Sequence, residues 1–495
     1  MKNENDSSLY RQIMKGTAVF GGSQLFTMFI NIVKGKLVAI ILRDYGMGIS
    51  SLMQSALMPM QQLFSFGLPT AGVRDMAAET DAERKSRVVV AFRRVLFVLA
   101  FLGMCTMAIG AMLFSISTFG DTSHALWFVE MAVALLFFIL QTGENSILQG
   151  YRQLKTLALC NIVGALCGLL FGVPLYWYFG IAGIVPSMII LSFTTWCFSR
   201  YFTRKIGVSH VRQTWYETWT WGRRMFLLGG AMMLAGLFGT LSTYFVNTFI
   251  RSYGTIADIG LFQAANMIVL QSTSLVFSAM ATDYFPHLSS IINSHEESSR
   301  LVEKEGEIVI LIMLPIISLL ILFAPLIVRI LLTSQFDSIV PLIRLMAISF
   351  VARAWCFPLD YVCLARGDKS FFFWVDGVFT NVKTFLLFVA GYYLFGLVGL
   401  GYAIVANAFI DILCSTLLNK WRYNITYSFG ILKVLLPMLF PCIFSLVVSF
   451  LISDVICYAI MGISATIVCL WSYIQLNKRI GIKELFTRKK RSVCL

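Results

Sequence analysis

Long runs of apolar residues dominate this chain, and short stretches between them carry most of its charge. A membrane-spanning helix needs about 20 apolar residues to cross a hydrocarbon core about 30 Å thick, and the runs reach that length repeatedly. Of the 495 residues, 58% are hydrophobic and 13% are charged, whereas soluble domains carry roughly 25% charged residues. The sequence therefore predicts an all-α integral membrane protein and excludes a water-soluble domain.

Breaks at charged, glycine or proline residues divide the apolar runs into about fourteen predicted helices. The predicted spans are 17–42, 47–72, 88–118, 124–149, 155–179, 181–199, 225–250, 258–282, 305–333, 338–365, 371–394, 397–419, 430–452 and 455–476. The first run follows a polar segment and is too long for a cleaved signal sequence, so it is predicted to be the first span.

The distribution of basic residues predicts the orientation. With both termini in the cytoplasm, the cytoplasmic segments hold 31 Lys and Arg residues and the outer loops hold two, Arg43 and Arg251. Such an asymmetry is what the positive-inside rule requires. The topology thus explains the formal net charge of +14, and no nucleic-acid partner is expected. The outer loops are also too short to hold a catalytic domain.

A weak internal repeat predicts two related halves. Gly48 and Gly260 begin similar segments 212 residues apart, each shortly after a Tyr-Gly pair. The offset covers six helices, an even number, so both halves have the same orientation. The alternative is chance similarity among Gly- and Phe-rich helices. The predicted domains are a six-helix lobe at 1–199, a cytoplasmic linker at 200–224, a second six-helix lobe at 225–419, an extra helix pair at 420–476 and a basic cytoplasmic tail at 477–495.

Charges at bilayer depth are the candidate functional residues, because each costs about 2.5–3.5 kcal/mol near a helix centre on insertion scales and so faces a cavity or a partner. Lys34 and Lys36 flank Gly35 in the first span, which holds no acid before Asp44. Residues two apart lie about 200° apart around a helix, so both lysines reach one cavity only if the helix breaks at Gly35. An unpaired cation beside water implies an anionic ligand such as a phosphate or pyrophosphate.

The other candidate charges, which lie within the predicted spans or at the end of one, are of both signs. The cations are Arg251, Arg344, Arg353 and Lys383, and the acids include Glu144, Asp360, Asp376 and Asp411. For Glu144 and the charges of the second half, two interpretations stay open. They contact a ligand or a coupling ion in a cavity, or they form buried ion pairs that hold the helices together.

No motif indicates a catalytic, nucleotide or metal site. None of the eleven cysteines forms a C-x-x-C pair, and the four histidines show no H-E-x-x-H pattern, so we expect no metal site, disulfide framework or cofactor. The chain also lacks a G-x-x-x-x-G-K-[ST] phosphate loop, so ATP hydrolysis within it is not expected. We predict no enzyme activity.

Several short motifs occur in order through about residue 425. They are Lys34-Gly35-Lys36-Leu37-Val38-Ala39, Gly46-Met47-Gly48-Ile49, Gln149-Gly150-Tyr151-Arg152, Phe277-Ser278-Ala279-Met280, Asp283-Tyr284-Phe285-Pro286-His287-Leu288 and Trp355 to Tyr361. In these motifs the chain resembles bacterial O-antigen and polysaccharide flippases of the multidrug/oligosaccharidyl-lipid/polysaccharide exporter superfamily. The resemblance implies a two-lobed inner-membrane transporter with a central cationic cavity. Such proteins flip undecaprenyl-pyrophosphate-linked oligosaccharides to the outer leaflet by alternating access, for O-antigen and lipopolysaccharide biosynthesis.

The resemblance also assigns roles and partners. By position, Lys34, Lys36, Arg251 and Arg353 become candidate contacts for the pyrophosphate and sugar, with Lys383, Asp376 and Asp411 as weaker candidates. Arg344 is a further candidate for the cationic cavity because of its charge within a span. The implied partners are the polyprenyl-pyrophosphate-linked oligosaccharide, membrane lipids and polysaccharide polymerase machinery. A peptidoglycan-precursor flippase and a drug/cation antiporter stay open as alternatives, although an antiporter needs an acid where the first span has lysines. A membrane polysaccharide polymerase is the remote alternative.

Overall fold

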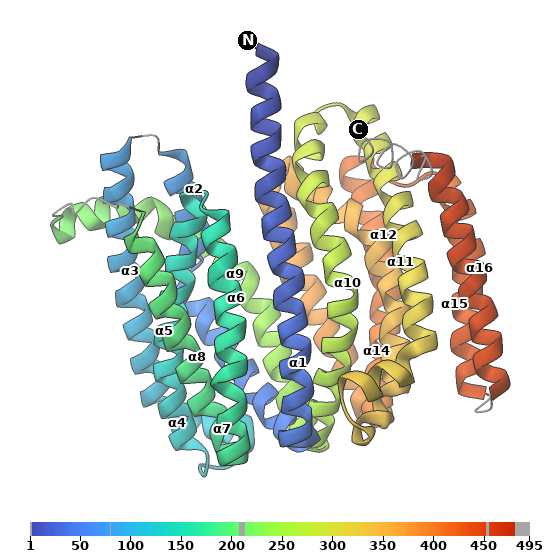
Figure 1. The fold of residues 1–495 in the computed structure, drawn as a ribbon, viewed down its shortest axis with the longest axis horizontal. Helices are drawn as coiled ribbons and strands as arrows, with labels where there is room; N and C mark the ends of the chain where they lie inside the picture. The colour runs from blue at the N-terminus through green and yellow to red at the C-terminus, as the bar shows by residue number, and fades with distance from the viewer. Residues whose placement is uncertain (1, 80, 207–212, 452–454, 481–495) are drawn as a thin grey trace, which may run out of the picture. The chain divides into compact units, whose positions relative to one another are not determined.

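The computed structural model describes residues 2–79, 81–206, 213–451 and 455–480, and every regular element in these residues is a helix (Figure 1). Within the same residues, eleven helical segments are long and apolar enough to cross a membrane. The prediction of an all-α, multi-pass membrane protein is therefore confirmed. The number of fourteen spans stays a prediction.

The chain divides into two compact units, which are described separately. Unit 1, residues 1–260 with 331–333, contains α1 (Lys2–Ser65), α2 (Leu68–Ala78), α3 (Ala82–Ile109), α4 (Ala111–Phe119), α5 (Ala125–Gly150), α6 (Leu154–Leu170), α7 (Gly172–Phe179), η1 (Gly180–Gly183), α8 (Ile184–Arg204), α9 (Trp215–Tyr253) and the start of α10 (Ile256–Ile291). Unit 2 contains the rest of α10, α11 (His295–Leu331), η2 (Ser334–Ile339), α12 (Val340–Arg366), α13 (Lys369–Phe372), the π-helix η3 (Phe373–Phe379), α14 (Thr380–Tyr423), α15 (Gly430–Leu451) and α16 (Val455–Ile480). The predicted six-helix lobes stay a prediction.

Three of the eleven segments are much longer than one bilayer crossing. They cover Leu25–Ser65, Lys155–Arg204 and Ser370–Tyr423, with 41, 50 and 54 residues. Each contains a backbone break near a predicted turn: Arg43 (φ 57°) in α1, Gly180 (φ 58°) after α7 and Gly396 (φ 61°) in α14. Because about 20 residues cross the hydrocarbon core, each of these segments is long enough to cross it twice.

Two polar segments are more helical than predicted. α1 begins at Lys2, so the expected polar N-terminal tail is part of a helix. The predicted linker at 200–224 also contains the start of α9, and its residues 207–212 lie outside the described residues, as does most of the predicted tail, 481–495. At the start of α9, Thr214 Oγ1 accepts from Glu217 N (3.3 Å) and Glu217 Oε2 accepts from Thr214 N (2.8 Å). This capping box starts the helix among polar residues, and its hydrogen bonds hold the pKa of the Glu217 carboxyl below its ordinary value.

The predicted span 47–72 is interrupted by a corner. α1 ends at Ser65, and Phe66 (φ 52°) and Gly67 (φ 61°) separate it from α2. A Cβ on Gly67 would lie 2.3 Å from the carbonyl oxygen of Gly229 on α9, so the corner packs directly on the backbone of another helix. Apolar periodicity carries no signal for such an approach, which is why the sequence predicted a continuous helix.

Gly48 and Gly260, the glycines that begin the predicted repeat, meet in unit 1. A Cβ on Gly48 would lie 1.9 Å from the carbonyl oxygen of Ile256, and a Cβ on Gly260 would lie 2.0 Å from that of Asp44. Gly48 thus packs on the residue four positions before Gly260, and Gly260 packs on the residue four positions before Gly48. The contacts between α1 and the start of α10 are therefore reciprocal. Only a residue without a side chain permits this backbone approach. The repeat itself stays a prediction.

We expect Gly48→Ala to destabilise the protein by about 1–3 kcal/mol, because the methyl group must displace backbone rather than a flexible side chain. The matched control is Gly462→Ala in α16, where a Cβ meets nothing within 4 Å. Heating of the detergent-solubilised protein, followed by size-exclusion chromatography, measures the midpoint of unfolding. A midpoint for Gly48→Ala equal to that of the control would contradict the close packing at this crossing.

Candidate functional site

The two lysines of α1 lie in different environments. α1 continues as a helix through Gly35, so the break that would bring both lysines to one cavity is absent. The two lysines therefore diverge, as an uninterrupted helix requires. Lys36 is exposed, whereas Lys34 is half-buried, with its Nζ 3.2 Å from the position of a Cβ on Gly168 of α6. Neither lysine makes an ion pair with any residue that the structure describes. Lys34 is therefore a partly desolvated cation without a described counter-charge.

Arg251 lies at the end of α9 and contacts the turn that follows α4. Its Nη2 donates to the carbonyl oxygen of Ser117 at 3.5 Å, and its Nη1 lies 2.4 Å from the position of a Cβ on Gly120. Nearby, Tyr244 Oη is 2.6 Å from Ser117 Oγ. These contacts connect α9 to α4, so the guanidinium is already partly engaged by the protein.

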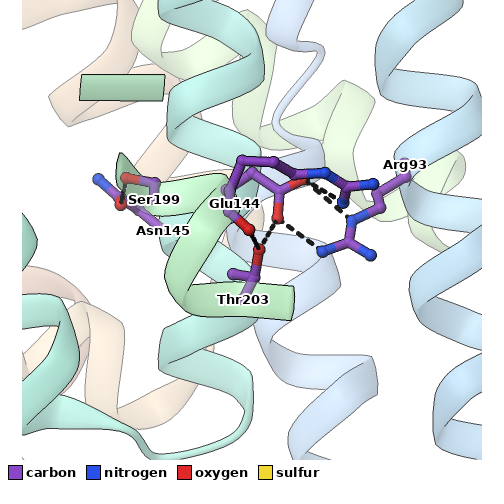
Figure 2. Close-up of polar contacts among 6 residues, drawn as sticks. Arg93, Glu144, Asn145, Ser199 and Thr203 are labelled. Atoms are coloured by element: carbon purple, nitrogen blue, oxygen red, sulfur yellow. Dashed lines mark hydrogen bonds and ion pairs between the residues drawn. The ribbon is translucent and has the colours of Figure 1, made fainter. Parts of the chain in front are cut away.

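Glu144 is the centre of a polar cluster within unit 1, shown in Figure 2. It is 5% exposed on α5, and Arg93 of α3 donates to both of its carboxylate oxygens, from Nε to Oε1 (3.0 Å) and from Nη2 to Oε2 (2.7 Å). From α8, Arg200 Nη1 donates to Oε1 (3.0 Å) and Thr203 Oγ1 donates to Oε2 (2.5 Å). Of the two roles considered for Glu144, the structure shows an ion pair that joins three helices.

Unit 2 contains a cavity of about 830 Å³, which we call the α12–α14 cavity. Residues of α10, α12, α13, η3 and α14 line it. Among them are four of the charges singled out in the sequence, Arg353, Asp360, Asp376 and Asp411. Since three carboxylates face one guanidinium, this cavity differs from the cationic cavity that the family resemblance implies.

Arg353 and Asp360 face the open space of the cavity. Arg353 is exposed, its Cζ lies 5.6 Å from the centre of the Phe277 ring, and it makes no ion pair with the residues described. Asp360 Oδ1 accepts from Ser415 Oγ at 2.9 Å. Both side chains are thus positioned to contact a polar ligand.

Lys383 is paired with Asp411 rather than free. The ammonium group contacts Asp411 Oδ1, the lysine side chain is 9% exposed, and Asn407 Nδ2 donates to Asp411 Oδ2 at 2.9 Å. On its other side, Lys383 lines an apolar groove of about 520 Å³ together with Trp374 and Val378. Lys383 thus forms an ion pair within unit 2.

Arg344 does not line the cavity. It is 7% exposed on α12, and its Nε donates to the carbonyl oxygen of Ile321 at 3.2 Å. Its Nη1 donates to the carbonyl oxygen of Ser449 at 3.5 Å. The side chain thus connects α12 to α11 and α15.

Several cavity residues were missed in the sequence. Asn407, Ser415 and Asn419 lie on α14 at four-residue intervals with Asp411, and all four line the cavity. Polar residues spaced by four share one face of a helix, so this stripe in an apolar segment was a detectable signal. The π-helix η3, which carries Asp376, had no such signal.

Asp368 closes the turn between α12 and α13 beside the cavity. It accepts from Phe371 N (3.2 Å), Arg422 Nη2 (3.1 Å) and Tyr423 Oη (3.2 Å). The backbone N–H of Phe371, followed by the Arg422 guanidinium, holds the pKa of the Asp368 carboxyl below its ordinary value. The turn is thereby attached to the end of α14.

Comparisons with known proteins agree with this architecture. The family described as polysaccharide biosynthesis protein matches residues 13–292. A Shigella flexneri protein described as a candidate O-antigen transporter is 25% identical over 280 residues, which cover 54% of this chain and 64% of that protein's length.

Three solved structures share the fold. The lipid II flippase MurJ, in an inward closed conformation, aligns with a TM-score of 0.73 at 15% sequence identity. The alignment covers 94% of this chain and 100% of the MurJ chain. A multidrug resistance MATE family transporter of the MOP superfamily, in an inward-facing conformation, aligns with a TM-score of 0.65 at 16% identity, over 80% of this chain and 94% of its own. A MOP superfamily transporter from Pyrococcus furiosus aligns with a TM-score of 0.61 at 15% identity, over 83% of this chain and 95% of its own.

We expect Glu144→Gln to destabilise the protein by about 3–5 kcal/mol, because it removes the counter-charge of two partly buried arginines. The matched control is Glu83→Gln, which breaks an exposed ion pair with Arg87 and is expected to cost less than about 0.5 kcal/mol. Thermal unfolding in detergent checks both variants. Equal midpoints would show that the cluster in Figure 2 contributes no more than a surface pair.

Proposed function

Since the chain belongs to the polysaccharide biosynthesis protein family, we propose that it is a flippase that moves undecaprenyl-pyrophosphate-linked oligosaccharides from the cytoplasmic to the outer leaflet. The relatives are membrane transporters rather than enzymes, and this chain is likewise a transporter of the same superfamily fold. The proposed substrate is an intermediate of O-antigen or another surface polysaccharide. We place the protein in the inner membrane with both termini in the cytoplasm, from the distribution of its basic residues.

The observation that carries this proposal is Lys34, a half-buried cation in an apolar helix without a described carboxylate partner. A lone ammonium at bilayer depth is costly, so it persists where water or an anionic ligand reaches it. The substrate head group supplies such an anion, because pyrophosphate offers several acceptor oxygens for charge-assisted hydrogen bonds. Lys36, exposed two residues away, adds positive charge along the same part of α1.

The remaining charges have supporting roles in this proposal. Arg353, which faces the α12–α14 cavity, is a further contact for the substrate, and Arg251 provides positive charge at the end of α9. Arg344, Glu144 and the Lys383–Asp411 pair hold helices together. Alternating access moves the head group between leaflets while the polyprenyl chain stays in the lipid.

The alternatives within the superfamily are a peptidoglycan-precursor flippase and a drug/cation antiporter. The likeness to MurJ extends over nearly the whole chain, but at 15% identity it bears on the fold alone. The family match favours a polysaccharide intermediate over both alternatives.

The direct test measures leaflet accessibility of a labelled lipid-linked oligosaccharide in vesicles with and without the purified protein. Labelled lipid II and a fluorescent cationic drug in parallel vesicles test the two alternatives. We expect transport of the oligosaccharide lipid alone. Transport of lipid II only, or of the drug only, would overturn the proposed substrate.

We further expect Lys34→Gln to reduce translocation at least tenfold, because it removes the counter-charge of the head group, while Lys34→Arg retains most of the rate. Tenfold corresponds to about 1.4 kcal/mol of lost stabilisation. The control is Lys420→Gln, an exposed lysine in the last turn of α14. Full activity of Lys34→Gln, at equal protein levels, would remove Lys34 from the transport mechanism.

A further inference from the structure

We propose that the α12–α14 cavity of unit 2 binds the saccharide part of the substrate, through its aspartates, amides and aromatic rings. This inference rests on the proposed function and assigns one part of the substrate to one site. It separates the sugars from the pyrophosphate, which the proposed function gives to the α1 lysines.

The polar lining suits hydroxyl groups. Asp360 and Asp376 present carboxylate oxygens, which accept hydrogen bonds. Asn407 has a second amide hydrogen besides the one that it donates to Asp411, and Ser415 Oγ, which donates to Asp360, can still accept. Sugar hydroxyls donate and accept at neighbouring carbons, so they match such a mixed set. Arg353 adds donors at the same surface.

Aromatic side chains complete the lining. Phe277, Phe357 and Tyr361 face the cavity from α10 and α12, and Phe371, Phe372 and Phe379 face it from α13 and η3. The Tyr361 ring packs against Phe357 at 5.0 Å between centroids, which holds both rings in place. Fixed aromatic faces contact the C–H faces of pyranose rings, whereas a pyrophosphate gains nothing from them.

The charge balance disfavours a pyrophosphate in this cavity. Because Lys383 pairs with Asp411, Asp360 and Asp376 remain in the cavity with Arg353 as the single cation of its lining. Like charges repel strongly in a cavity of low dielectric, so a multiply charged anion is better held elsewhere. A neutral or sparsely charged saccharide avoids this penalty.

The spacing of the carboxylates disfavours a metal ion. Among the described residues, no three His, Cys, Asp or Glu side chains come close enough together to hold one. The aspartates are instead distributed over α12, η3 and α14. Acceptors spread around about 830 Å³ suit an extended ligand with several hydroxyl groups, since ligand pockets typically measure roughly 300–1,000 Å³.

Binding to the purified full-length chain tests the proposal with two probes. The first is the phosphate-free oligosaccharide released by mild acid from the lipid-linked intermediates of the source cells. The second is farnesyl pyrophosphate, which carries a lipid and a pyrophosphate but no sugar. Isothermal titration calorimetry measures both for the wild type, Asp376→Ala, Asp376→Asn and the control Asp337→Asn, an aspartate of unit 2 that pairs with Arg329 outside the cavity.

We expect the oligosaccharide to bind the wild type and the control alike, and to bind Asp376→Ala at least tenfold more weakly, with Asp376→Asn between them. Farnesyl pyrophosphate is expected to bind all four proteins equally, which also shows that the variants are folded. Equal oligosaccharide affinity for Asp376→Ala and the wild type would overturn the saccharide site. So would the absence of wild-type binding at about 10 mM oligosaccharide, far above the range of a functional subsite.

The vesicle assay separates this inference from the proposed function. If the oligosaccharide lipid is translocated but the oligosaccharide does not bind in the cavity, the saccharide site is overturned and the proposed flippase function is retained. If the oligosaccharide binds but the lipid-linked form is not translocated, the saccharide site is retained and the proposed flippase function is overturned. If Asp376→Ala loses only a dependence of transport on a proton or sodium gradient and binds sugar normally, the cavity serves a coupling cation and the saccharide site is wrong.

Discussion

An ionised side chain in the hydrocarbon core of a membrane raises the free energy of the protein unless it has a partner or contacts water. The arrangement of the intramembrane charges follows from this constraint. Several of these groups have polar partners within the protein. Glu144 receives donors from two arginines and a threonine, Lys383 contacts Asp411, and Arg344 reaches backbone carbonyls. Such partners stabilise the charges within the membrane and attach helices to one another. Lys34, Lys36 and Arg353 stand out because they make no ion pair with the residues that the structure describes.

The same reasoning divides the proposed substrate between two chemical environments. The α1 lysines offer positive charge without a described counter-charge, which suits a pyrophosphate. The α12–α14 cavity offers carboxylates, amides and aromatic rings, which suit a saccharide. A lipid-linked oligosaccharide carries both parts in one molecule. In this proposal, the three aspartates of the cavity face the sugars rather than the pyrophosphate.

Close backbone approaches are the second constraint on the fold. Where helices cannot rely on exclusion of water to hold them together, small residues permit tight packing. Gly48 with Gly260, and Gly67 with Gly229, place backbone against backbone at distances that no side chain would tolerate. The first pair also joins the two segments that the sequence relates by a repeat. Packing in unit 1 thus depends on the absence of side chains at a few positions.

Sequence alone determined what depends on composition along the chain: an all-helical membrane protein, the approximate positions of its helices and the set of charges that need a partner or water. These follow because burial of about 20 apolar residues per helix is a local requirement. It also placed breaks near Arg43, Gly180 and Gly396.

Only the tertiary structure decided which charges pair, because Glu144 and Arg93 are 51 residues apart in sequence and meet through packing. It alone showed that α1 continues through Gly35 and that the corner at Gly67 rests on α9. Three aspartates from three elements share one cavity, and no pattern within any one helix specifies that meeting.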